Sequence, residues 1–407
     1  MMSTTSTITA VIIMAVTLLF QSCSSGRGQR RDASLATFVN LGEALGNEKD
    51  FLLSELATDI RHIALETSED ILISSRGSFT GDPVILTPEG FLLITQNKTP
   101  LHIFDSEGRF IRRIGSIGRG PGEYSTGYMT VYCSELRHIY IKNSYGGDIL
   151  EFDWEGNLIK KFRAEADLLN FQVIDKGLFL GALSVFPQHD TLGYNYILFN
   201  DQGETVKTIA IDGNAIVDLA PEGSAHVQGY IMTPLLSIGQ KGININTLRN
   251  DTIFTVYKNG DINYTLTWDK GRYTPDFPIH LAPNYRDRAD HFLQIQLVTE
   301  TRQYWYLNCL LEKRVNRILL DKRDGTAFRI SRVTNDIDGT LTQLPGFNTR
   351  GDQVIRLTDP VMLKKSISSN SYSDEDLKYP EKERAFREMV EALKEDDNPV
   401  VTIITFR

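Results

Sequence analysis

Cysteine is scarce in this sequence, and the three that occur are Cys23, Cys133 and Cys309. Cys133 and Cys309 lie inside strand-like runs and no CxxC pair is present, which excludes a disulfide framework as the basis of the fold. We therefore expect both residues to be buried free thiols. The seven histidines are scattered, and none belongs to an HExxH motif or another close pair suited to zinc.

Basic residues are also fewer than acidic residues. The chain has 43 Lys and Arg residues against 52 Asp and Glu residues, a formal net charge of −9. A nucleic-acid-binding protein normally carries a basic excess or a basic stripe, so we expect no nucleic-acid partner. A GxSxG nucleophile motif is absent as well, and we expect no local catalytic residues.

The N-terminus has no apolar run long enough to cross a bilayer comfortably. Ile8–Phe20 is apolar over 13 residues, which is shorter than the ~20 residues of a transmembrane helix. It fits the hydrophobic region of a signal peptide, and the following Leu19–Cys23 (LFQSC) resembles a lipobox. We expect residues 1–22 to be a lipoprotein signal peptide, Cys23 to be lipidated and residues 23–50 to form a polar tether. The alternative is a soluble secreted protein that is cleaved nearby.

Turn sequences recur along the chain at regular spacing. Phe104–Gly108 (FDSEG) and Phe152–Gly156 (FDWEG) are near-copies 48 residues apart, and Phe199–Gly203 (FNDQG) follows after another 47. Weaker copies end at Gly260 and Gly325. Alternating apolar residues flank each copy, which predicts a strand, a tight turn and a second strand, with glycine adopting a positive φ.

A further strand-like run precedes each turn, and a sixth follows the last one. These runs are Phe91–Thr95, His138–Lys142, Gly177–Leu183, Gly242–Leu248, Gln303–Cys309 and Val354–Thr358. Repeats of ~45–60 residues with several strands each are typical of propeller blades. We expect an all-β fold, a six-bladed β-propeller over residues 51–407, in which these runs are the inner strands.

The expected blades are approximately 79–122, 124–163, 168–211, 226–276, 291–333 and 341–407. Pairing the C-terminal run Val400–Phe406 with the N-terminal strand Ile60–Leu65 in the sixth blade would close the ring and hide two strand edges. One short amphipathic helix, starting at Pro380, should precede the closing strand. Its apolar stripe is Phe386, Met389, Val390 and Leu393.

Two glycine-containing segments suggest ligand loops but fail the tests for them. Gly115–Tyr124 lacks the Lys-Ser/Thr end of a P-loop, and Pro121 disfavours a helix opening on its glycines, so we interpret it as a crossover between blades. Asn335–Gly339 (NDIDG) would place Thr334 and Pro345 at the ends of an EF-hand loop, where acidic ligands are needed. We expect a turn entering the sixth blade there, in which Asp side chains accept from backbone amides.

These segments carry a family resemblance. Gly115–Tyr124, followed by IYIKNSYGGDILEFDWEGNLI, is similar to the NHL-type propeller repeat. The pieces RHIALETSEDILIS, GRGPGEY, RNDTIFTV, TNDIDG and DDNPVVTIITF resemble a Bacteroidetes group of six-bladed β-propeller lipoproteins related to the TolB-like propellers. The resemblance covers Phe51 to the C-terminus and implies a fold and a lipoprotein, but little about activity.

Polar residues follow several of the expected inner strands. If these strands run parallel around the axis, their C-terminal ends gather at one mouth, with Gln96, Asn97, Asn143, Asn250, Asp251, Asn308 and Asp359. Arg119 and Glu123 in the crossover are further candidates. The mouth could bind a saccharide through paired hydrogen bonds, or calcium through Asn143, Asn250 and Asp359, as in the gluconolactonase-like propeller hydrolases. Equally, Asn and Asp occur at strand ends because turns favour them.

Tyr304–Tyr306 (YWY) poses a related choice, because alternate side chains of a strand point to opposite faces. We expect core packing on both faces; the alternative is a saccharide-binding surface on one. Taken together, the sequence predicts a lipid-anchored, non-catalytic binding module for a glycan or a protein at the outer membrane, more on its periplasmic face. The alternatives are a calcium-dependent hydrolase or lyase and a scaffold subunit of an outer-membrane complex. No other cofactor is expected.

Overall fold

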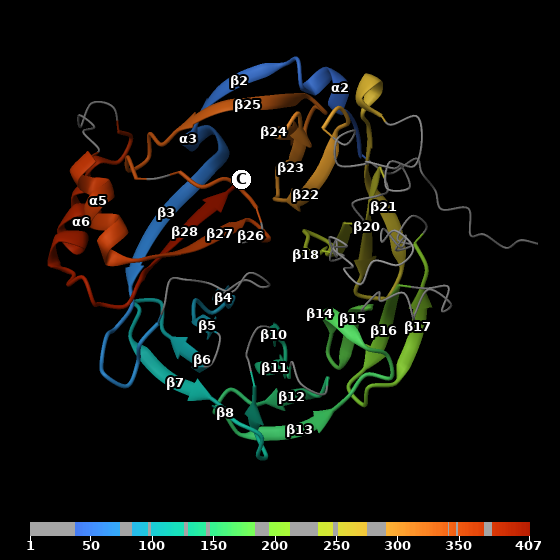
Figure 1. The fold of residues 1–407 in the computed structure, drawn as a ribbon, viewed down its shortest axis with the longest axis vertical. Helices are drawn as coiled ribbons and strands as arrows, with labels where there is room; N and C mark the ends of the chain where they lie inside the picture. Colours follow the sequence, from blue (N-terminus) through green and yellow to red (C-terminus); the bar gives the residue numbers. More distant parts are fainter. Residues whose placement is uncertain are drawn as a thin grey trace, which may run out of the picture. The chain divides into compact units, whose positions relative to one another are not determined.

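The structure is a computed structural model that describes residues 37–73, 84–96, 99–125, 129–143, 147–183, 195–211, 235–246, 251–274, 290–340, 342–346, 349–369 and 377–407. These residues belong to one unit, Leu35–Arg407. The unit contains six sheets of four or five strands arranged around a central axis, which confirms the six-bladed β-propeller (Figure 1). Cys23 and the predicted signal peptide lie outside the described residues.

The first three blades have four strands each, in order from the axis outward. Blade 1 contains β4 (Val84–Leu86), β5 (Leu92–Gln96), β6 (Thr99–Phe104) and β7 (Phe110–Ile114). Blade 2 contains β10 (Met129–Cys133), β11 (His138–Lys142), β12 (Ile149–Phe152) and β13 (Leu158–Phe162). Blade 3 contains β14 (Leu168–Asp175), β15 (Leu178–Leu183), β16 (Tyr196–Asn200) and β17 (Thr205–Ile209).

The last three blades also use the N-terminal part of the chain. Blade 4 contains β18 (Leu235–Ile238), β19 (Gly242–Asn246), β20 (Thr252–Tyr257), β21 (Ile262–Asp269) and β1 (Thr37–Asn40). Blade 5 contains β22 (Gln294–Glu300), β23 (Tyr304–Leu311), β24 (Arg314–Asp321), β25 (Ala327–Thr334) and β2 (Glu48–Leu52). Blade 6 contains β26 (Thr349–Arg350), β27 (Gln353–Thr358), β28 (Val400–Phe406) and β3 (Ala57–Ala64).

The predicted inner strands are in fact second from the axis. A preceding strand, β4 in blade 1 and β26 in blade 6, lies closer to the centre of the ring (Figure 1). These two strands have only three and two residues, too few to show an alternating pattern. The ends of β5, β11, β19, β23 and β27 therefore lie one strand away from the axis.

The N-terminal arm corrects a second expectation. Residues 37–50, assigned to the tether from the sequence, form β1, the short helix α2 (Leu41–Ala44) and most of β2. β1 pairs in parallel with β21, and β2 pairs in parallel with β25. These strands cover the outer edges of blades 4 and 5. A second short helix, α3 (Leu53–Leu56), leads into β3.

Two helices precede the closing strand, where one was predicted. α6 (Pro380–Ala392) begins at the expected proline and buries Phe386 and Val390, while Leu393 is its C-cap. α5 (Pro360–Ser369) was not predicted, because its LKKSISS end has only a short apolar stripe of Leu363 and Ile367. Leu363 of α5 packs with Phe386, Val390 and Val400 against blade 6.

The repeated glycines are explained by the turns between the third and fourth strands. Gly108, Gly156, Gly203, Gly260 and Gly325 have φ between 75° and 92°, as predicted. In the first repeat, Asp105 Oδ1 accepts from the backbone amides of Glu107 (3.0 Å) and Arg109 (2.8 Å). The repeat thus combines an Asx turn with a glycine in the left-handed region.

The same turns also join neighbouring blades. A Cβ atom on Gly108 would overlap the Ala64 carbonyl oxygen of blade 6, and one on Gly203 would overlap the Arg163 carbonyl oxygen. Four residues after each of the first three repeat glycines, a basic side chain reaches the next blade. These contacts are Arg112 to Trp154 O (3.2 Å), Lys160 to Asp201 (2.6 Å) and Lys207 to Gly260 O (2.9 Å).

An apolar cluster fills each seam between neighbouring blades. Trp305 packs between blades 4 and 5, whereas Tyr304 and Tyr306 pack between blades 5 and 6. This confirms that both faces of the YWY strand are core. Cys133 and Cys309 are buried free thiols in two different seams, as expected.

The crossover from blade 1 to blade 2 has a structural role. β8 (Ser116–Ile117) pairs in parallel with β9 (Glu123–Tyr124). The buried Tyr124 hydroxyl donates to Ile114 O and accepts from Leu101 N, both at 2.7 Å. The GRGPGEY motif therefore fixes the path between two blades.

Candidate functional site

The structure places most of the predicted mouth residues at or just beyond strand ends, but Asn308 lies inside β23 and so is not at the predicted mouth. Gln96 is the last residue of β5, and Asp359 lies between β27 and α5. Asn143 follows β11, and its side-chain oxygen accepts from the Ser125 hydroxyl at 2.5 Å. Asn97 and Asn250 lie outside the described residues, so a shared site of Asn143, Asn250 and Asp359 stays a prediction.

Asp251 and the two crossover candidates have local contacts. The Asp251 carboxylate pairs with Lys270 (2.6 Å) and accepts from the Trp268 indole (2.9 Å). Glu123 accepts from the Gly120 amide at 2.7 Å and so closes its own loop. Arg119 is exposed, and the described residues show no ion pair between it and Glu123.

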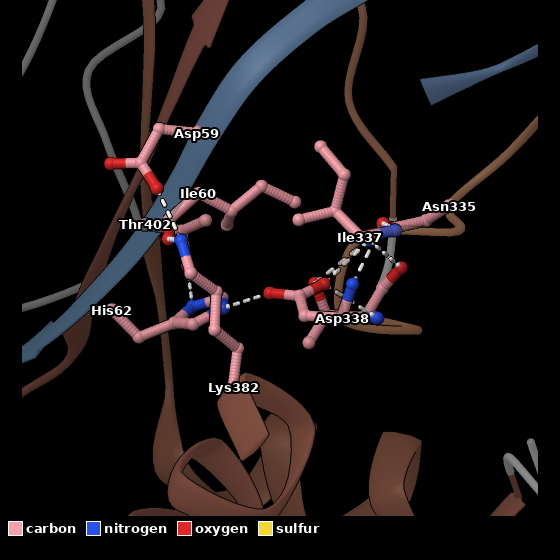
Figure 2. A network of polar contacts seen from close by, with 9 residues as sticks. Asp59, Ile60, His62, Asn335, Ile337, Asp338, Lys382 and Thr402 are labelled. Carbon is pink, nitrogen blue, oxygen red and sulfur yellow. Dashed lines mark hydrogen bonds and ion pairs between the residues drawn. The ribbon is translucent and has the colours of Figure 1, made fainter. Parts of the chain in front are cut away.

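A buried polar network lies where blade 6 meets the crossover that enters it. His62 Nε2 lies 2.9 Å from Asp338 Oδ2, and His62 Nδ1 lies 3.0 Å from the Thr402 hydroxyl (Figure 2). The His62 ring packs on Phe386 of α6, with centroids 4.2 Å apart. The network therefore joins β3, β28, α6 and the crossover.

The NDIDG turn supplies hydrogen bonds to the other carboxylate oxygen of Asp338. Asp338 Oδ1 accepts from Asn335 Nδ2 (2.7 Å) and from the Thr340 amide (3.1 Å) and hydroxyl (2.8 Å). Burial alone would raise the pKa of Asp338, but the hydrogen bond and positive field of His62 and the bonds from Thr340 lower it. The predicted turn with Asp side chains accepting backbone amides is confirmed.

A hydroxyl, an imidazole and a carboxylate in series could serve as a nucleophile, a base and an orienting group. The cavity beside Thr402 and His62 has a volume of only about 30 Å³. That is room for about one water molecule and not for a substrate. In this structure the series acts as a cross-link between chain segments.

A much larger groove lies on the seam between blades 5 and 6. We call it the Asn308 groove; its volume is about 580 Å³. Its polar lining is Asn308, Arg317, Ser331, Arg332, Thr342 and Gln343. Its apolar lining is Ile330, Val333, Leu344, Pro345 and the backbone of Gly346. This volume is within the range of ligand sites, ~300–1,000 Å³.

Strand register positions the two central polar residues. Asn308 of β23 lies directly opposite Arg317 of β24 in the antiparallel pair, so their side chains project from the same face. That face continues through Tyr306 and Tyr304 into the core of the seam. Ile330, Val333 and Leu344 pack against the same core, which gives the groove a firm apolar floor.

The groove is positively charged. Arg317 and Arg332 line it, and no carboxylate does so among the described lining residues. Arg332 pairs with Asp50 at 2.9 Å, but both side chains are more than half exposed, so the pair is weak. Arg317 is exposed and makes no ion pair within the described part of the chain.

The crossover links the groove to the buried network. Residues 335–340 form the NDIDG turn, and residues 342–346 form one wall of the groove. Gln343 lines both the groove and the small cavity beside His62, and its Oε1 atom is buried without a hydrogen bond from the described residues. The His62–Asp338 pair therefore fixes the base of a groove wall.

Another cavity, of about 390 Å³, lies on the same seam and includes Tyr304 and Phe328. Four of its five charged side chains pair with one another, Lys49 with Glu55 and Arg323 with Asp321, while Arg407 donates to the Ser54 carbonyl oxygen at 3.3 Å. This cavity is a weaker candidate than the Asn308 groove.

Asn308 was a candidate from the sequence because it lies near the end of a strand-like run, whereas Arg317 and Gln343 were not candidates. The pairing of β23 with β24 brings Arg317 to Asn308, and only an accurate register would have revealed it. Among the described residues, no group of three or more His, Cys, Asp or Glu side chains is placed to hold a metal ion. The described helices include none long and apolar enough to cross a membrane.

Comparison with solved structures identifies the fold. A Bacteroides fragilis protein inferred to be exported matches with a TM-score of 0.64 and 14% identity, covering 88% of this chain and 99% of that chain. An inactive variant of virginiamycin B lyase from Staphylococcus aureus matches with a TM-score of 0.35 and 9% identity, over 60% and 68%. BamB from Moraxella catarrhalis matches with a TM-score of 0.35 and 10% identity, over 67% and 66%. The last two similarities are too weak to inform function.

Comparison of sequences identifies the family. No curated protein matches this chain. One family model covers residues 36–405, from the start of the N-terminal arm to the closing strand. The chain belongs to the family described as Domain of unknown function (DUF4934).

Proposed function

We propose that this chain is an extracytoplasmic, lipid-anchored binding module that holds a ligand of the cell envelope in the Asn308 groove. The signal-peptide-like run Ile8–Phe20 and the lipobox-like Cys23 support export and anchoring. The shared fold with a protein inferred to be exported agrees with this placement. The resemblance to Bacteroidetes lipoproteins supports placement at the outer membrane, and the lack of an acidic run after Cys23 supports its periplasmic face.

The observation that carries the proposal is the contrast between two cavities. The groove offers about 580 Å³ with amide, hydroxyl and guanidinium groups over an apolar floor. The only hydroxyl–imidazole–carboxylate series in the described residues borders about 30 Å³. A site with ligand-sized volume and no acid–base pair among its described lining residues favours binding without turnover.

A ligand screen tests this proposal. The full-length chain in detergent is screened by thermal shift against envelope glycans and peptides, and each hit is measured again with Asn308→Ala and Gln343→Ala. Asn316→Ala is the matched control, because Asn316 is on the neighbouring strand outside the groove. We expect weaker binding in both groove variants and unchanged binding in the control. The proposal is contradicted by a ligand that binds equally well to all three variants and the wild type, or by a ligand that the protein converts chemically.

The anchor is tested separately. Metabolic labelling with a radioactive fatty acid should mark the full-length chain and not Cys23→Ser, and the labelled chain should fractionate with the outer membrane. Equal labelling of both proteins would contradict lipidation at Cys23.

A further inference from the structure

We infer that the Asn308 groove takes an extended acidic peptide segment with an aliphatic side chain next to its carboxylate. This inference rests on the proposed binding function and specifies the chemistry of the ligand. It follows from the charge of the groove, from its two amide side chains and from the nature of its floor.

The charge of the groove selects an anion. Two arginines and no carboxylate are found among the described lining residues. Arg317 has no ion-pair partner within the described chain, and its planar guanidinium suits two parallel hydrogen bonds to a carboxylate. The protein as a whole is acidic, with a net charge of −9, so this local positive site distinguishes the groove from its surroundings.

The amide side chains suit a peptide backbone. Asn308 and Gln343 can each donate and accept hydrogen bonds, as the N–H and C=O groups of an extended chain require. The buried Oε1 atom of Gln343 accepts no hydrogen bond from the described residues, and a buried acceptor is stabilised by a donor. A peptide N–H group would supply that donor if the Gln343 amide turned toward the groove.

The floor favours an aliphatic side chain over a sugar ring. Ile330, Val333, Leu344 and Pro345 supply the apolar surface, and none of the described lining residues is aromatic. Sugar rings usually pack on aromatic rings, whereas a Leu or Val side chain of a peptide is buried equally well against aliphatic groups. An acidic peptide therefore matches more of the groove than an acidic saccharide does.

A phage-displayed library of random hexapeptides, selected against the full-length chain in detergent, tests the inference. We expect the selected peptides to be enriched in Asp or Glu beside Leu, Ile or Val. Arg317→Gln should weaken binding of the best synthetic peptide about tenfold, the size of one charge-assisted contact. Arg314→Gln is the matched control, since Arg314 is exposed on the same strand and, three positions away, projects from the opposite face.

The outcomes separate this inference from the proposed function. Selected peptides that are neutral or basic, or whose binding is equal in Arg317→Gln and Arg314→Gln, overturn the acidic-peptide inference. A glycan from the parallel screen that binds through Asn308 while no peptide is selected also overturns it, yet leaves the binding function intact. Failure of both screens would contradict the binding function itself.

Discussion

The Nε2 atom of His62 lies 2.9 Å from the carboxylate of Asp338, which joins the outermost strand of blade 6 to the crossover that enters this blade. Asp338 is fully buried and His62 nearly so. The same crossover continues into a wall of the Asn308 groove. The pair therefore stabilises the closure of the ring and the base of the candidate site together.

Asp338→Asn tests this relationship. Removing one partner of a buried pair leaves the other uncompensated, so we expect a loss of about 3 kcal/mol in the free energy of unfolding, measured with urea. The exposed Asp396→Asn, which changes the charge equally, should have almost no effect. Because the folded-state pKa of Asp338 is lowered, its contribution is present above about pH 4 and is lost as the pH falls through the lowered value. If the two variants were equally stable at neutral pH, the pair would not be a structural cross-link.

A second pH effect concerns His102 in blade 1. Burial, with the positive charge of Arg113 as a smaller cause, lowers the pKa of His102 to about 4. The unfolded chain then binds one more proton between about pH 6.5 and pH 4, so stability falls by about 3 kcal/mol as the pH decreases across this window. In His102→Leu this part of the pH dependence should disappear, while in the exposed His291→Leu it should persist. Parallel curves for His102→Leu and the wild type would refute the assignment.

Substitutions at two repeat glycines distinguish the cost of backbone strain from the cost of a clash between blades. Gly203 has φ 89°, and a Cβ atom there would overlap the Arg163 carbonyl oxygen. Gly325 has φ 75°, and nothing lies within 4 Å of the same atom. We expect Gly325→Ala to cost about 1 kcal/mol, the strain of a left-handed residue, and Gly203→Ala about 2 kcal/mol more. Similar midpoints of urea unfolding for the two variants would contradict the proposed docking of the turn on blade 2.

Calcium binding distinguishes the binding module from the hydrolase alternative. The proposal predicts that added Ca²⁺ and subsequent chelation leave the melting temperature of the full-length chain unchanged. A ligand at 100 times its Kd would add about 2.7 kcal/mol, which is visible as a shift of a few degrees. A rise with Ca²⁺ that is reversed by chelator and lost in Asn143→Ala or Asp359→Ala would support the hydrolase instead.

The sequence predicted the fold because its strongest signals are local. The turn at Phe104–Gly108 combines an Asx side chain with a glycine of positive φ, and such a glycine recurs at the same turn in blades 1 to 5. Two of the strands nearest the axis, β4 and β26, escaped prediction because they have only three and two residues. The parallel strands β1 and β2 also escaped, because their pairing with distant strands has no local signature.

The candidate site was less predictable because it depends on pairing between strands. Asn308 could be named from its place in a strand-like run, but Arg317 becomes its neighbour only through the register of β23 with β24. Gln343 belongs to a crossover whose position is set by the burial of Asp338 against His62. These are tertiary relationships, which spacing along the sequence does not encode.

Hydrogen–deuterium exchange of the full-length chain in detergent, with and without the tightest ligand from the screens, tests the central claim most directly. The account predicts slower exchange in residues 330–333 and 342–346, which line the Asn308 groove, when the ligand is bound. Protection confined to the ends of β5 and β11, around Gln96 and Asn143, would contradict it and return the site to the predicted mouth of the propeller.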